Sequence, residues 1–274
     1  MFIIIGVRPV IRIRQATEVA VAVMGRELVP AMKRTLLYRA ARKVYRGIVP
    51  RRPSIWELND QYDRQTVEVM RRTLRPDSTA VDIGAHAGAI LREMFSVAPR
   101  GRHFAFEPLP HLAASLRRNY PEARVHAVAL NDTAGTGTFH YVVNSPAESG
   151  LRLHAIHGDA SNVQQITVPI RRLDDVIGLE ERISFIKIDA EGAELPIIRG
   201  GLDMIRRCRP AIVFESGDRS TPYYGVGPDD IFSTIVEQLG MRLSTMARWL
   251  EGRPPYTHRR FRRDCRHEFY FIAY

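Results

Sequence analysis

From residue 78 onward, short apolar runs alternate with stretches in which apolar residues recur at helical spacing. Short apolar runs of this kind are typical of strands buried on both faces of a parallel sheet. We therefore predict five strands: Thr79–Ile83, His103–Phe106, Arg124–Ala129, Ile183–Ile188 and Ala211–Phe214. Helices are expected between them, near 88–98, 110–119, 194–207 and 228–239. The alternation predicts an α/β fold, a mostly parallel sheet with helices on both faces.

The region 135–170 interrupts this alternation. Thr136–Val143 and Val163–Ile170 alternate apolar and polar residues with period two, which predicts an inserted pair of antiparallel strands. The polar stretch Ser145–Ser161 between them is expected to overhang the end of the sheet. A last strand is expected at Glu268–Ala273, after an arginine-rich stretch that forms either a solvated loop or an anion-binding rim.

The first 53 residues have a different character. Apolar residues recur at helical spacing from Val29 to Val44, with arginines and a lysine on the other side, and Pro50 and Pro53 end the pattern. We predict a basic helical extension, 1–53, followed by one catalytic domain, 54–274. The extension either packs on the body or contacts an acidic partner or, through residues 26–52, an anionic membrane surface.

The net charge of +10 belongs to this extension alone. Residues 1–53 carry twelve Lys/Arg and two Glu, and the other 221 residues carry 28 basic and 28 acidic groups. A neutral body argues against nucleic acid as the partner. The 45% of hydrophobic and 26% of charged residues are typical of a globular chain.

Two cysteines are too few for a disulfide framework or a cysteine zinc site. No apolar run approaches the ~20 residues that span a bilayer. Arg8 closely follows the apolar start Met1–Ile5, which leaves too short an apolar stretch for a secretory signal. We expect a cytoplasmic protein, with membrane association through the extension as the alternative.

A glycine turn carries the first chemical pattern. The strand that contains Asp82 leads into a helix through Gly84 and Gly88, and Glu107 closes the second strand nineteen residues further on. Gly84 allows the backbone to approach a ligand closely, and an acid at Glu107 can accept hydrogen bonds from both ribose hydroxyls. The spacing differs from the NAD fingerprint. It resembles the pattern of class I methyltransferases that use S-adenosylmethionine (SAM).

A second cluster of acids follows the later strands. Asp189 and Glu215 stand at the carboxyl ends of two strands that we expect to be neighbours, where ligands bind in open α/β sheets. Such carboxylates repel unless a cation, a basic side chain or a proton lies between them. Two kinds of cation would offset this repulsion. One is Mg²⁺ held by Asp189 and Glu215, and the other is an arginine such as Arg152 or Arg219.

Several motifs around these acids occur together and in order. They are Phe106-Glu-Pro108, Ala129-Leu-Asn-Asp132, Leu173-Asp-Asp175, the segment from Phe185-Ile-Lys-Ile-Asp189 to Glu194, and the strand that ends in Glu215. Together they closely resemble the FkbM-type methyltransferase family over residues 79–215. One departure is His86, where the family more usually has Asn.

The resemblance implies a Rossmann-like fold and SAM as the methyl donor. It also implies O-methylation of a hydroxyl on a sugar, a glycolipid or a macrolide-type product. It places the cofactor at Asp82, Gly84, Ala85, His86, Gly88, Glu107, Pro108, Asp132 and Asp189. For catalysis we predict Asp189, Glu191 and His154, of which the histidine comes from the overhanging loop.

Two other functions fit parts of this pattern. An RNA methyltransferase would use the basic extension to hold phosphates. No Asn/Asp-Pro-Pro-Tyr-like motif follows the fourth core strand, which argues against it. In a non-catalytic SAM-binding module the extension would carry the function. The intact glycine and acidic motifs argue against such a module.

Overall fold

The computed structural model describes residues 55–153, 162–216 and 221–274. The boundary predicted at residue 53 and the basic extension lie outside these ranges. The chain divides into two units between Leu58 and Asn59, and the second unit contains both sheets and the candidate site. Within the described ranges no helix combines the length and the apolar character needed to cross a bilayer.

Seven strands form the main sheet, in the order β3-β2-β1-β7-β8-β10-β9. Strand β10 is antiparallel to both of its neighbours, whereas β3, β2, β1, β7 and β8 are parallel. The strands of this sheet are β1 (Thr79–Ile83), β2 (Phe104–Phe106), β3 (Arg124–His126), β7 (Ile183–Ile188), β8 (Ala211–Glu215), β9 (Leu243–Thr245) and β10 (Tyr270–Ala273).

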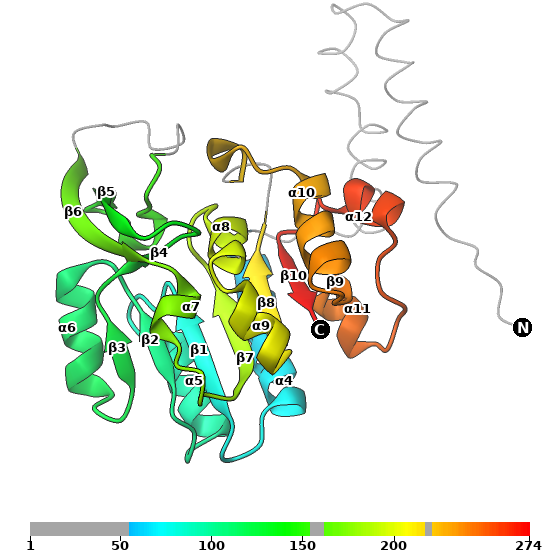
Figure 1. Ribbon diagram of the computed structural model, residues 1–274, viewed down its shortest axis with the longest axis horizontal. Coiled ribbons are helices and arrows are strands. Elements are labelled where there is room, and N and C mark those ends of the chain that lie inside the picture. Colours follow the sequence, from blue (N-terminus) through cyan, green and yellow to red (C-terminus); the bar gives the residue numbers. More distant parts are fainter. Residues whose placement is uncertain (1–54, 154–161, 217–220) are drawn as a thin grey trace, which may run out of the picture. The chain divides into compact units, whose positions relative to one another are not determined.

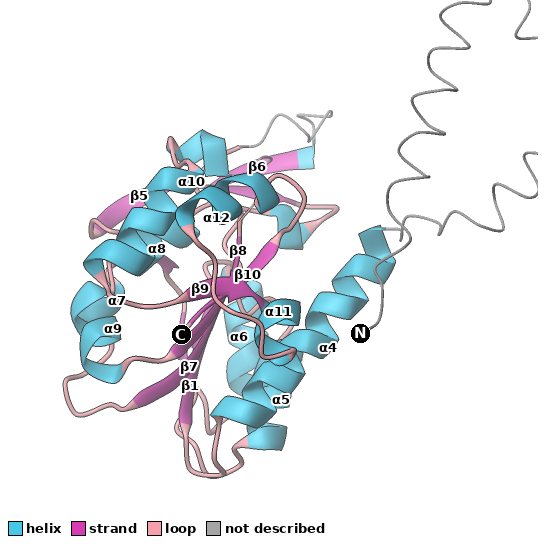
Figure 2. Ribbon diagram, turned by 90° about the vertical axis from the view of Figure 1, so that its right-hand side faces the viewer, coloured by secondary structure: helices cyan, strands magenta, loops and turns pink. Residues whose placement is uncertain are grey.

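Helices cover both faces of this sheet, as the alternating pattern predicts (Figures 1 and 2). Helices α7 to α10 lie on one face, and α4, α5 and α11 lie on the other (Figure 2). The α-helices are α4 (Ile55–Thr73), α5 (Ala89–Val97), α6 (Pro110–Asn119), α7 (Leu173–Val176), α8 (Glu194–Arg199), α9 (Leu202–Cys208), α10 (Pro228–Phe232), α11 (Met246–Leu250) and α12 (His258–Asp264). Shorter helical turns are η1 (Pro146–Glu148), η3 (Thr221–Tyr224) and the π-helix η4 (Ser233–Gln238).

The inserted strands form a second, three-stranded sheet. Strands β5 (Gly135–Val142) and β6 (Val163–Arg171) pair antiparallel, which confirms the predicted insertion. Strand β4 (Ala129–Leu130) adds to β6 in parallel. The predicted strand Arg124–Ala129 is therefore divided between two sheets, because Ala129 pairs with Ile170 of β6 and not with β2.

Two predicted helices are also interrupted. The expected helix 194–207 is broken at Gly200, where a Cβ atom would lie 2.3 Å from the backbone oxygen of Asn131. Only a residue without a Cβ allows the chain to pass so close. The expected helix 228–239 begins as α10 and continues as the π-helix η4.

The apolar core lies between the main sheet and its helices. Phe104, Phe185, Phe214 and Phe271 come from four different strands and are at most 2% exposed. Burying side chains of this size contributes about 1.5–3 kcal/mol each, so the strands are held together by packing as well as by hydrogen bonds.

Deleting residues 1–46 is expected to leave this core folded. Within the described ranges the core is built from residues that the deletion keeps, and the deleted residues carry most of the excess charge. Thermal unfolding followed by circular dichroism should retain one cooperative transition. A deletion that also removes α4, with buried Val69 and Met70, should destabilise the core. Loss of the transition in the shorter deletion would show that the extension is part of the fold.

Candidate active site

The turn after β1 has an unusual backbone. Gly84, His86 and Gly88 all have positive φ angles, of 77°, 47° and 84°. A Cβ on Gly84 would lie 1.9 Å from the backbone oxygen of Asp189, so glycine is required for the ends of β1 and β7 to approach. At His86 the left-handed conformation is one that Asn adopts readily, which fits the Asn expected there from the family resemblance.

Glu107 locks this turn to the end of β2. Its Oε2 accepts a hydrogen bond from the His86 N–H at 2.8 Å, and its Oε1 accepts one from the Leu109 N–H at 2.9 Å. The side chain is buried, and burial raises the pKa of Glu107 although the two N–H donors oppose that rise. Each oxygen retains a lone pair after these bonds. The donor and acceptor chemistry therefore fits the two hydroxyls of an adenosine ribose.

The other predicted cofactor residues do not all gather here. Ala85 and Gly88 are buried in the turn, and Pro108 follows Glu107 directly. Asp82 is buried inside β1, where its Oδ2 has no hydrogen-bond partner and burial raises its pKa to about 7. Asp132 is exposed and lies beside Gly200 at the end of α8, so nothing in the described structure joins it to the turn.

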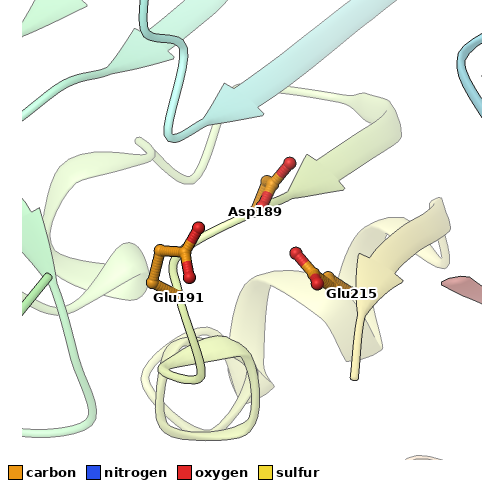
Figure 3. A group of neighbouring side chains, drawn as sticks. All are labelled: Asp189, Glu191 and Glu215. Atoms are coloured by element: carbon orange, nitrogen blue, oxygen red, sulfur yellow. The ribbon is translucent and has the colours of Figure 1, made fainter. Parts of the chain in front are cut away.

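Three carboxylates converge at the ends of β7 and β8. Their oxygens, from Asp189, Glu191 and Glu215, lie within 4.8 Å of one another (Figure 3). Strands β7 and β8 are parallel neighbours, as we expected for Asp189 and Glu215. Three hard oxygen ligands in this arrangement are able to hold a divalent cation.

Asp189 already has a cation beside it. Lys187 Nζ lies 2.7 Å from its Oδ2, and the hydroxyl of Tyr270 donates to the same oxygen at 2.8 Å. Burial alone would raise the pKa of Asp189, but Lys187 and hydrogen bonds from Glu215 and Tyr270 lower it to about 2. The nearby negative charges in turn keep the pKa of buried Lys187 above its usual value. Asp189 is therefore a fixed anion.

Glu215 behaves in the opposite way. Burial and the negative charge of Asp189 raise the pKa of Glu215 well above its usual value. In its protonated form this carboxyl group donates the hydrogen bond that lowers the pKa of Asp189. The pair shares one negative charge, which Lys187 balances.

Glu191 stands in a strained turn. Its φ is 51°, which is uncommon for a residue with a Cβ, and Gly192 follows with a φ of 97°. The Glu194 carboxylate stabilises this turn by accepting the N–H groups of Ala190 at 2.9 Å and Gly192 at 3.1 Å. Burial, followed by the charges of Asp189 and Glu194, raises the pKa of Glu191 to about 8.

The second sheet brings its loop over this turn, as predicted. Gly150 pairs with His140 of β5, and a Cβ on Gly150 would lie 3.5 Å from that of Glu191. Tyr224 of η3 lies on the same side, since Glu194 and Glu191 both contribute to the rise of its pKa. The predicted base His154 and the alternative cation Arg219 lie outside the described residues, and Arg152 is exposed.

Two members of the site were not predicted from the sequence. Tyr270 begins β10, which is antiparallel, so its side chain reaches the edge where the parallel strands end. Lys187 lies inside an apolar strand, and its proximity to Asp189 is what reveals its role. In the sequence, the feature that indicates an ion pair between Lys187 and Asp189 is their spacing of two residues, because alternate residues of a strand share a face.

The strand order and the glycine turn define the class of protein. A sheet of five parallel strands, followed by an antiparallel β10 and then the edge strand β9, with Glu107 after β2, is the Rossmann-like fold of class I SAM-dependent methyltransferases. The profile of the Methyltransferase FkbM domain matches residues 82–243, more than half of the chain. The chain belongs to the FkbM methyltransferase family.

Two curated proteins and one solved structure are similar to parts of this chain. The 2-O-methyltransferase NoeI of Sinorhizobium fredii is 30% identical over 165 residues, which cover 53% of this chain and 65% of NoeI. The AMB antimetabolite synthetase AmbE of Pseudomonas aeruginosa is 29% identical over 211 residues, 62% of this chain and 10% of AmbE. A crystal structure of methyltransferase FkbM from Methylobacillus flagellatus KT has a TM-score of 0.46 at 19% identity, covering 73% of this chain and 45% of that one. The chain thus spans less than two thirds of the length of each.

We expect Glu107→Ala to weaken the binding of SAM or S-adenosylhomocysteine by about 1.5–3 kcal/mol, the range for hydrogen bonds to a charged group. The substitution also leaves the buried N–H groups of His86 and Leu109 without their acceptor. Titration calorimetry measures the change, with Glu122→Ala, an exposed acid far from the turn, as the control. Equal affinity of the two variants, or no binding by the wild type, would overturn the assignment of Glu107.

Proposed function

We propose that the protein is a SAM-dependent O-methyltransferase that acts on a hydroxyl of a sugar, a glycolipid or a macrolide-type natural product. The observation that carries this proposal is Glu191, a carboxylate held in a strained turn beside the end of β7, with a pKa raised to about 8. A base with such a pKa suits the removal of a proton from a hydroxyl near neutral pH. The name of NoeI, a 2-O-methyltransferase, supports the same chemistry.

Asp189 and Glu191 have different roles in this proposal. A carboxylate with a pKa of about 2 that accepts from Lys187 and Tyr270 is too weak a base to take a hydroxyl proton. We assign Asp189 to orientation, as an anion fixed beside the glycine turn. Glu191 takes the proton, and Glu194 positions it by holding the turn.

SAM, when bound, supplies a methyl group that is already activated as part of a sulfonium. Glu107 and the turn from Gly84 to Gly88 would hold the nucleoside. The remaining task of the protein is to align the acceptor hydroxyl and to remove its proton as the new C–O bond forms. Alignment of this kind accelerates a reaction strongly. The proton passes to the Glu191 carboxylate and from there to water.

Mg²⁺ is the alternative to a protein base. Bound by Asp189, Glu215 and Glu191, it would lower the pKa of the acceptor hydroxyl. The ion pair with Lys187 already compensates the charge of Asp189, and Glu215 is hydrogen-bonded to the same carboxylate, which favours the arrangement without the metal. His154 stays a prediction as a second base.

We also propose a partner for the basic extension. Residues 26–52 would contact an anionic membrane surface and hold the enzyme near a glycolipid acceptor. Weaker vesicle binding by the protein that lacks residues 1–46 than by the full chain would support this contact. Unchanged binding would refute it.

The rate of methyl transfer should rise with pH and level off above about pH 8. A general base acts only when it is deprotonated, and burial raises the pKa of Glu191 to about 8, so its active fraction grows through neutral pH. Glu191→Gln should lower kcat by roughly 10²- to 10⁴-fold and abolish this rise. The assay uses labelled SAM with sugars, glycolipids and RNA in parallel, and Glu122→Gln serves as the control.

Treatment with EDTA, followed by Mg²⁺, separates the two mechanisms. We expect full activity in the chelator, because the proposed base is part of the chain. Activity that disappears in EDTA and returns with Mg²⁺ would establish the metal instead. Methylation of RNA alone would refute the proposed acceptor class.

A further inference from the structure

Helix α12 presents an unusual concentration of arginines. Phe261 is fully buried and anchors one side of the helix to the core. The opposite side and the turn after the helix carry an arginine face, which consists of the exposed residues Arg259, Arg262, Arg263 and Arg266. The spacing of four residues, from 259 to 263 and from 262 to 266, places these side chains together.

The acids around this face neutralise only part of its charge. Arg262 lies 3.2 Å from Asp229, and Arg263 and Arg260 lie 2.7 and 3.3 Å from Asp264. Five arginines less two aspartates leave a net charge of +3. Arg259 and Arg266 have no ion pair with any described residue, and exposed arginines without partners are available to an anion.

Exposed apolar side chains lie on the same edge of the molecule. Large exposed hydrophobic residues are few in the described ranges, and three of them, Val143, Leu153 and Tyr223, flank the overhanging loop and η3. They are 38%, 42% and 40% exposed. We call these three residues the apolar rim.

The chain topology places the apolar rim and the arginine face at one edge. Helix η3 follows the carboxyl end of β8, and α12 precedes the start of β10, where Tyr270 pairs with Glu215. Both views show α12 and the outer ends of β5 and β6 beyond the same ends of the parallel strands (Figures 1 and 2). The three acids of the candidate site lie at the ends of β7 and β8, which is the same edge.

Cationic side chains together with exposed apolar ones are typical of a surface that lies on a lipid bilayer. A soluble phosphate would be recognised by the arginines alone and would give no reason for an apolar rim. A single-stranded nucleic acid requires several stacking rings, and Tyr223 is the one aromatic residue of the rim. The acids Asp229, Asp264, Glu148 and Glu191 on this edge restrict the attraction to the region around α12.

We propose that the arginine face and the apolar rim dock the protein on an anionic lipid surface, with the candidate site turned toward the lipid. This inference deepens the proposed function, since it implies that the acceptor is presented from a membrane. It concerns residues different from those of the basic extension. Binding to lipid is measured without methyl transfer, so the two proposals succeed or fail independently.

The test measures binding of the full chain to vesicles of phosphatidylcholine with and without phosphatidylglycerol. Arg259→Gln with Arg266→Gln should weaken binding to the anionic vesicles roughly 25-fold, about fivefold for each charge removed. Arg100→Gln with Arg118→Gln removes two exposed arginines from the opposite edge and should change little. Calorimetry with SAM should give the same affinity for both double variants, which shows that each is folded.

The apolar rim has its own pair of variants. Val143→Ser with Leu153→Ser should reduce vesicle binding by at least about tenfold, because both side chains would be buried in the interface. The control is Leu179→Ser. Leu179 is 83% exposed and lies beyond the other edge of the sheet. A wild-type protein that does not bind anionic vesicles overturns the proposal, as do double variants that bind like their controls. Binding of pyrophosphate at the arginines without vesicle binding would also overturn it, in favour of a soluble anion.

Discussion

The ion pair between Lys187 and Asp189 is the interaction on which the site depends. Lys187 is the only lysine after residue 43, and its side chain is 7% exposed inside a chain whose other basic residues after that point are arginines. An ammonium group is a compact charge on a flexible stem, so it fits between two strands where a planar guanidinium needs more room. Removal of either partner would leave an uncompensated buried charge, which is strongly destabilising.

This ion pair determines how the other carboxylates behave. Because Asp189 is held ionised, its charge raises the pKa of Glu215 and contributes to that of Glu191. Glu215 and Tyr270 then act as donors to Asp189, which ties β8 and β10 to the end of β7. Of the three converging carboxylates, Glu191 in the strained turn has a pKa of about 8, which suits proton transfer in the proposed mechanism. Asp189, the acid that the sequence motifs single out, is thus held in place as an anion.

The sequence predicts the parallel strands, the glycine turn and the acids after the strands because these depend on local patterns. Short apolar runs identify β1, β7 and β8, and the position of an acid directly after a strand places it at the edge of the sheet. The role of Tyr270 was not predicted, because it depends on the pairing of β10 with β8, 55 residues earlier in the chain. Helices α4 and α12 were missed since tertiary contacts stabilise short or polar helices that have weak local patterns.

The position of the arginine face bears on the electrostatics of the site. An anionic bilayer repels carboxylates, and its negative potential raises their pKa values further within about a Debye length. Without cations at the same edge, contact with lipid would keep Glu191 protonated and unable to act as a base. Arginines on α12 attract the lipid and offset its potential near β10 and β8. The charges on α12 are therefore compatible with a site that works at a membrane, although its own centre is acidic.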